Sequence, residues 1–179
     1  SHFNQIVSLN PSYVHYDLNK MREEMKEVLA SYQYYLFIDF EMTMPGYHDH
    51  QFFPEIIQAG YVLSKAQGKI MHQDGYYILP KEKSTLSKRT KRFLNLNEEK
   101  FFKEAKKYDH FYKKLSKIIK KYNPKLVVWG KNDLSALNDS YVLHDKEKLT
   151  SDTNFIDLLK LHKDYFNLKD DLGLFKAYK

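Results

Sequence analysis

Apolar and polar residues alternate in three stretches of the chain, over residues 34–43, 55–64 and 69–80. Alternation over that length is typical of β-strands with one buried face. The turn-like stretch 65–68 between the second and third indicates a hairpin, so we expect the three strands to form an antiparallel meander. A near-continuous apolar run over 124–130 follows a long helical stretch. It predicts a buried strand parallel to the first.

Helical periodicity and capping residues predict most of the remaining elements. We expect helices over 17–29, over 97–122 with a break near Asp109, over 134–143, over 158–166 and from 171 onward, and a short strand over 154–159. This order predicts an α/β fold in which helices flank a mixed sheet of five strands. We expect residues 1–179 to form a single domain, with 1–33 as an N-terminal extension and 34–179 as the core.

Two carboxylates lie near the end of the first predicted strand. Asp39 and Glu41 are two residues apart and therefore face the same side, while Ile38 and Phe40 face the other. Burying two like charges is costly unless a cation lies between them, although a half-exposed strand would simply turn both acids to water. Asp133 directly follows the fourth strand and can approach the pair if that strand runs parallel to the first. Oxygen ligands alone favour Mg²⁺ or Mn²⁺ over zinc.

Composition adds a possible partner and a compartment. Lys and Arg total 29 against 23 Asp and Glu, a formal charge of +6. This surplus suits a polyanion such as nucleic acid, and it equally suits a lysine-rich surface that serves solubility. The chain has no cysteine, which excludes disulfides and thiolate metal sites and fits a cytoplasmic protein. No apolar run is long enough to span a bilayer, so we expect no membrane association.

Basic residues are densest just before the long helical stretch. The cluster consists of Lys81, Lys83, Lys88, Arg89, Lys91 and Arg92. It is either a set of phosphate contacts, with Lys88, Arg89 and Arg92 as the candidates, or a solvated face. The lysines of 103–121 lie between apolar positions and are interpreted as a solvated face. His48 and His50, in a loop bounded by prolines, are either metal ligands or solvated side chains, and Trp129 is expected in the core.

The order and spacing of six short segments resemble the DEDD superfamily of 3′–5′ exonucleases. The segments are residues 38–43, 54–58, 86–90, 127–133, 155–158 and 172–177. The resemblance covers residues 34 to 179 and is greatest to the DEDDh-type branch that trims RNA 3′ ends. It implies a ribonuclease H-like fold and a metal-dependent exonuclease acting on the 3′ ends of single-stranded RNA or DNA.

The resemblance also implies roles for individual residues. Asp39 would be a ligand shared by two Mg²⁺ or Mn²⁺ ions, and Glu41 and Asp133 would complete their coordination. The 3′-terminal nucleotide would lie against the end of the first strand, near Phe40, Met42 and Thr43. These expectations make Asp39, Glu41 and Asp133 the candidate catalytic residues.

The family's third motif supplies a general-base histidine, or a tyrosine in a sister branch, together with a fourth metal-binding aspartate. It would follow the 172–177 stretch, and no match to it is found. His162 and Asp170 come too early and at the wrong spacing, and Tyr165 with Asp170 misses the sister spacing by one residue. We therefore expect residues 1–179 to bind Mn²⁺ weakly and hydrolyse slowly or not at all, unless His144 or His162 is the base. The alternative is a catalytically silent ribonuclease H-like module that binds nucleic acid or a protein.

Overall fold

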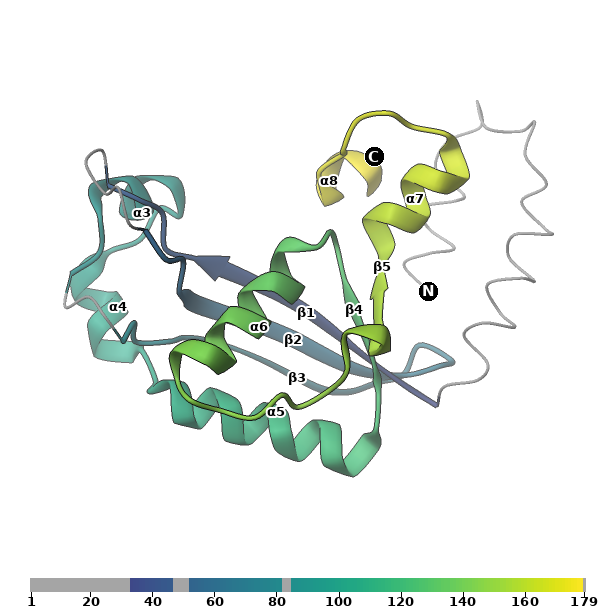
Figure 1. Cartoon of the computed structure of the whole chain (residues 1–179), viewed down its shortest axis with the longest axis horizontal. Coiled ribbons are helices and arrows are strands. Elements are labelled where there is room, and N and C mark those ends of the chain that lie inside the picture. The colour runs from purple at the N-terminus through teal and green to yellow at the C-terminus, as the bar shows by residue number, and fades with distance from the viewer. Residues whose placement is uncertain (1–32, 47–51, 82–84, 179) are drawn as a thin grey trace.

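The computed structural model describes residues 33–46, 52–81 and 85–178, with strands and helices arranged as Figure 1 shows. The predicted helix at 17–29, His48, His50 and Lys83 lie outside the described residues. The strands are β1 (Tyr34–Met42), β2 (Ile56–Lys65), β3 (Ile70–Tyr77), β4 (Lys125–Val128) and β5 (Phe155–Asp157). The helices are α3 (Lys88–Phe93), α4 (Glu98–Glu104), α5 (Tyr108–Tyr122), α6 (Asn132–Leu143), the 3₁₀ turn η2 (Asp152–Asn154), α7 (Leu158–Phe166) and α8 (Leu174–Tyr178). Among these helices, none has the length and apolarity required to cross a membrane.

The strands form one five-stranded sheet in the order β3-β2-β1-β4-β5, which confirms the predicted mixed sheet. β1 lies at its centre, antiparallel to β2 and parallel to β4. β2 and β3 form the expected hairpin, and Gly68 in its turn has a φ of 89°, which favours glycine. The parallel pairing of β1 and β4 brings the carboxyl ends of both strands to the same edge of the sheet. This is the edge where ligand sites gather in such folds.

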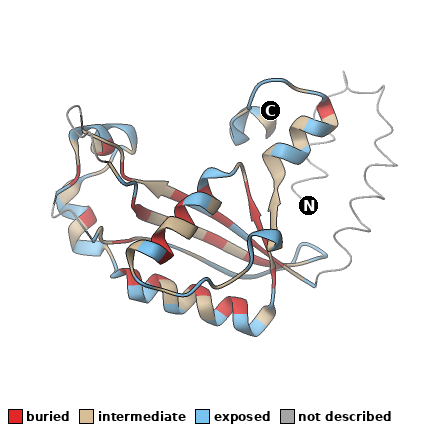
Figure 2. Ribbon diagram, in the orientation of Figure 1, coloured by how far each residue is buried: buried red, intermediate tan, exposed pale blue. Residues whose placement is uncertain are grey.

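The main core lies on one face of β1. Leu36, Ile38 and Phe40 are at most 5% exposed, and they pack against apolar side chains of α5 and α6. Burial alternates along the middle of β1, where Phe37 on the opposite face is 39% exposed. Figure 2 colours the sheet by burial. The predicted separation of the strand's two faces is therefore confirmed, and the face that carries Asp39 is the open one.

A smaller cluster of Ile57, Leu86 and Phe101 holds α3 and α4 against the sheet. The long helix predicted over 97–122 is two helices, and the break falls at 105–107 rather than near Asp109. Lys106 explains the break, because its N–H donates to Tyr77 and its carbonyl accepts from Leu79, both at the end of β3. A peptide unit that pairs with a strand edge cannot continue a helix. The basic segment before it forms the short helix α3.

Candidate active site

The end of β1 and the start of α6 bring three carboxylates together. Asp39 and Glu41 lie on the open face of β1, whereas Asp133 is only 7% exposed in the first turn of α6. β1 pairs with β4 only as far as Phe37, so the Phe40 N–H lies beyond that ladder. The Phe40 N–H donates to Asp133 Oδ1 at 2.9 Å. This bond fixes Asp133 beside the strand that carries the other two acids.

The pKa shifts of these acids report their mutual proximity. The pKa of Asp133 is raised to about 6, first by burial and then by the charges of Asp39 and Glu41, against the lowering effect of the hydrogen bond from the Phe40 N–H. Burial also raises the pKa of Asp39. The pKa of Glu41 is raised by burial and then by the charge of Asp39. Each negative charge is therefore costly here, and a bound cation would offset that cost.

The chemistry of the three side chains fits a divalent metal ion. Asp39, Glu41 and Asp133 offer carboxylate oxygens only, the donors that Mg²⁺ and Mn²⁺ prefer. No histidine or acid cluster among the described residues forms a preformed cage around a common point. The fit therefore rests on donor type and mutual repulsion, and a metal would draw the carboxylates closer together.

The turn after β4 sets the direction of α6, the helix that carries Asp133. Gly130 has a φ of 92°, and a Cβ there would meet Leu159 Cδ2 at 3.4 Å, so glycine suits both its backbone and its surroundings. The Gly130 N–H donates to Asp157 Oδ1 at 3.0 Å, and the same oxygen caps α7 by accepting from the Lys160 N–H at 3.2 Å. Sequence reasoning missed this positioning role of Asp157. An aspartate directly before a helical stretch was the available signal.

Only some of the groups predicted to contact the 3′-terminal nucleotide are accessible at the end of β1. For Phe40 the prediction is wrong as far as its ring is concerned, because the ring is 4% exposed and packs edge-on against Phe111 in the core. Its N–H is already bonded to Asp133. Met42 is half-buried at the strand end. Thr43 is buried, and its Oγ1 accepts from the Glu55 N–H at 2.9 Å, which leaves the hydroxyl hydrogen as its remaining donor.

Helix α3 is hydrogen-bonded to the chain that follows β1. Thr90 is fully buried, and its Oγ1 accepts from the Met44 N–H at 2.9 Å. The Ser87 hydroxyl donates to the Met44 carbonyl at 3.0 Å and also caps the helix. These bonds place the basic helix next to the end of β1.

The basic residues of α3 divide into two sets. Lys88, Arg89 and Arg92 are exposed. Lys91 instead forms an ion pair with Glu98 at 2.7 Å. Among the basic residues of α3, the three exposed cations are thus the ones without an acidic partner, in the described part of the chain, near enough to compete with a phosphate.

Every histidine that the structure describes contacts an aromatic ring. His144 stacks on Tyr108 with ring centroids 3.6 Å apart. It lies at the end of α6 opposite Asp133, which argues against its role as base. His162 packs against Trp129 and Phe166, and burial lowers its pKa. Trp129 itself lies past the end of β4, half-buried rather than in the core, and donates to the Leu172 carbonyl.

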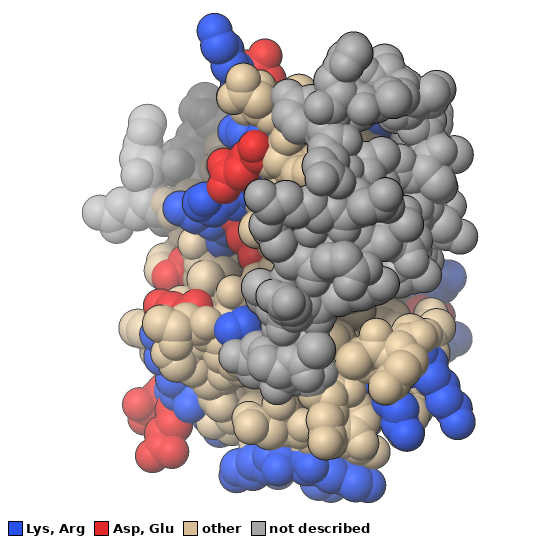
Figure 3. All heavy atoms as spheres, turned by 90° about the vertical axis from the view of Figure 1, so that its right-hand side faces the viewer, with Lys and Arg blue, Asp and Glu red and all other residues tan. Residues whose placement is uncertain are grey.

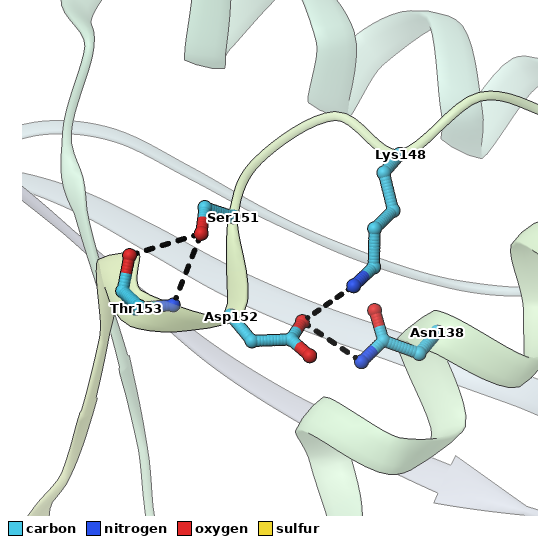
Figure 4. A network of polar contacts seen from close by, with 5 residues as sticks. All are labelled: Asn138, Lys148, Ser151, Asp152 and Thr153. Atoms are coloured by element: carbon cyan, nitrogen blue, oxygen red, sulfur yellow. Dashed lines mark hydrogen bonds and ion pairs between the residues drawn. The ribbon is translucent and has the colours of Figure 1, made fainter.

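Some of the other Lys side chains form ion pairs with acids, and others lie along α5. The hollow beside α6 contains Lys146 and Lys148, which pair with Asp109 and Asp152. Figure 4 shows Lys148 and Asn138 converging on the Asp152 carboxylate. Lys and Arg side chains also gather along the lower edge of the molecule in Figure 3, the edge along which α5 runs in Figure 1. The lysines of α5 are thus on the far side of the core from the three acids.

Comparison with known proteins finds one curated relative with clear sequence similarity. No family model matches the chain. The probable 3′-5′ exonuclease KapD of Bacillus subtilis (strain 168) is 32% identical over 144 residues, which are 79% of this chain and 69% of the relative.

Solved structures share the fold at lower identity. The nuclease domain of 3′hExo, a DEDDh family member bound to rAMP, superposes with a TM-score of 0.64 at 22% identity, covering 76% of this chain and 72% of that one. E. coli exonuclease I in complex with a dT13 oligonucleotide superposes with a TM-score of 0.60 at 11% identity, covering 76% of this chain and 30% of that one. These likenesses show the ribonuclease H-like fold.

Proposed function

The chain belongs to the DEDD superfamily of 3′–5′ exonucleases, and on that premise we propose that it removes nucleotides from the 3′ ends of single-stranded RNA or DNA. The observation that carries the proposal is the convergence of Asp39, Glu41 and Asp133 at the end of β1, where the charge of Asp39 raises the pKa of Glu41 and the charges of both raise the pKa of Asp133. The Phe40–Asp133 hydrogen bond joins the two elements that supply them.

Asp39, Glu41 and Asp133 are the residues that would hold divalent metal. When bound, Mg²⁺ or Mn²⁺ lowers the pKa of water and stabilises charge on the leaving oxygen. The protein's own part is to orient the substrate. Met42 and the Thr43 hydroxyl face the terminal nucleotide at the end of β1. A histidine and a fourth acid from a third motif after residue 177 would accept the proton and complete the metal ligands.

The substrate class rests on the basic helix and on the relatives. Lys88, Arg89 and Arg92 are exposed on α3, which Thr90 and Ser87 tie to the end of β1. Cations in that place can hold the phosphates that precede the terminal nucleotide. The 3′hExo domain was solved with rAMP and exonuclease I with dT13, which supports both RNA and DNA as candidate substrates.

The proposal is tested by the polarity of degradation. A single strand labelled at its 5′ end should yield a ladder of progressively shorter labelled products in Mn²⁺, and none in EDTA. The same strand labelled at its 3′ end should release labelled mononucleotide first. Binding without shortening, at enzyme excess and over hours, by a chain lengthened through a histidine-and-aspartate segment would overturn the proposal in favour of the silent module.

A further inference from the structure

Helix α3 carries an exposed aromatic ring beside its exposed cations. Phe93 is 69% exposed, the most exposed aromatic residue of the described chain apart from Phe175 in α8. Phe93 has no aromatic partner among the described residues and belongs to neither core cluster. Scattered exposed apolar residues are ordinary. This ring is distinguished by its neighbours.

The helical spacing puts Phe93 between the buried side of α3 and its cationic side. Residues of an α-helix are offset by about 100° each, so Phe93 lies about 60° from Thr90 around the axis. Arg89 is one turn before Phe93 and therefore adjoins the ring on the same face. Arg92 lies next to Arg89 around the axis, on the side of the helix that is farther from Thr90. Thr90 contacts Met44, two residues past the end of β1, and Phe93 and Arg89 lie about 60° and 100° around the helix axis from that contact.

We infer that Phe93, Arg89 and Arg92 form a stacking subsite for a single-stranded nucleic acid, upstream of the nucleotide that is removed. An aromatic face stacks on any base, and guanidinium groups beside it hold the adjoining phosphates. The proposed occupant follows from charge complementarity and from the direct hydrogen-bonded link between α3 and the end of β1. The subsite rests on the proposed function, because it assigns a place to the strand that enters that same site.

The test measures binding without turnover. A 5′-fluorescein single strand is titrated in EDTA with wild-type protein and with Phe93→Ala, Phe93→Leu and Phe93→Tyr, and its anisotropy is followed. Loss of one stacked base should weaken binding by about five- to a hundredfold in Phe93→Ala. Phe93→Leu, which stays apolar but loses the π-face, should be weakened similarly, and Phe93→Tyr should bind like wild type. Thermal unfolding should be the same for all four, because the ring is exposed.

A second set of strands locates the stacked base. Each strand carries one abasic residue, at successive positions from the 3′ end. At the stacked position, wild-type affinity should fall, and Phe93→Ala should cause no further loss, so the two changes are non-additive. At the other positions they should add.

Equal affinity of wild type and Phe93→Ala, or additivity at every position, would overturn the subsite. Neither result would touch the proposed function, which fails only if the lengthened chain does not shorten the strand.

Discussion

Asp133 is the acid whose charge the fold tolerates least. It is nearly enclosed, it lies beside two other carboxylates, and its pKa is raised from 3.8 to about 6. A group with a raised pKa in the folded state adds stability below its unfolded pKa. That contribution is lost as the pH rises through the folded pKa. Without metal, the protein should therefore lose stability between about pH 4 and pH 6.5.

Asp133→Asn keeps the acceptor for the Phe40 N–H and removes the charge. In EDTA at pH 7.5 its free energy of unfolding should exceed that of wild type by about 3 kcal/mol, and at pH 3.5 the two should agree. Urea unfolding at both pH values measures this. Asp139→Asn, on the same helix but away from the acids, is the matched control and should show no such difference. A wild-type stability that is flat across this range would contradict the electrostatic account of the site.

Gly130 sets the direction in which α6 leaves the sheet. With a φ of 92°, Gly130→Ala should cost about 1–3 kcal/mol of stability and should also weaken Mn²⁺ binding, because Asp133 follows on the displaced helix. Gly173→Ala is the control, since a Cβ there meets nothing within 4 Å and its φ is ordinary. Calorimetric titration of Mn²⁺ and thermal unfolding compare the two. Equal behaviour of the two variants would show that the turn does not position the site.

Residues with local signals were predictable, and residues with distant partners were not. Asp39 and Glu41 could be assigned to one face because strand periodicity is local. The ring of Phe40 could be assigned to the opposite face for the same reason, but the sequence does not reveal that the Phe40 N–H is bonded to Asp133. Thr90 looked like an ordinary polar residue of a basic stretch, and only the fold brings it to Met44.

Helix α3 is the element on which the substrate proposals depend. The structure refines the basic cluster, because Lys91 is paired with Glu98 whereas Lys88, Arg89 and Arg92 are exposed. Phosphate contacts release counterions, and each one adds about 0.7 to the slope of log K against log salt for a single strand.

Neutralising Lys88, Arg89 and Arg92 together to Gln should therefore lower that slope by about 2 and weaken binding similarly for all sequences. Lys91→Gln on the same helix should leave the slope unchanged. Anisotropy titrations from 50 to 300 mM salt, on two strands of unrelated sequence, measure both. A triple variant with the wild-type slope would identify the cluster as a solvated surface.

At the scale of elements, the strands themselves and most helices followed from periodicity. The break between α4 and α5 did not, because it depends on Lys106 pairing with the end of β3. Backbone pairing between distant segments does not change the periodicity of apolar residues, so the sequence pattern does not locate the break.

At the scale of the whole molecule the ribonuclease H-like sheet is present, whereas the assignment of Asp39, Glu41 and Asp133 to the family's metal-binding acids and the third motif are both proposals. We expect a chain lengthened by a segment with a histidine and an aspartate at the family's spacing to hydrolyse a single strand about 10²–10⁴-fold faster than residues 1–179, the usual contribution of a general base. Mn²⁺ affinity should rise with it. A variant of that segment with both residues replaced by alanine controls for added length. Equal rates would place the base within residues 1–179, with His162 the first candidate.

The most direct test of the central claim is the rate at which a 5′-labelled single strand is shortened in Mn²⁺ by wild type and by Asp39→Ala, at enzyme excess. The account predicts slow 3′ shortening by wild type, faster shortening once the histidine-and-aspartate segment is added, and in both backgrounds a loss of at least about 10²-fold on Asp39→Ala. Folding should be retained, since the charge of Asp39 is costly in the metal-free protein. A variant that shortens the strand at the wild-type rate would show that Asp39, and with it the three-acid site, does not carry the reaction.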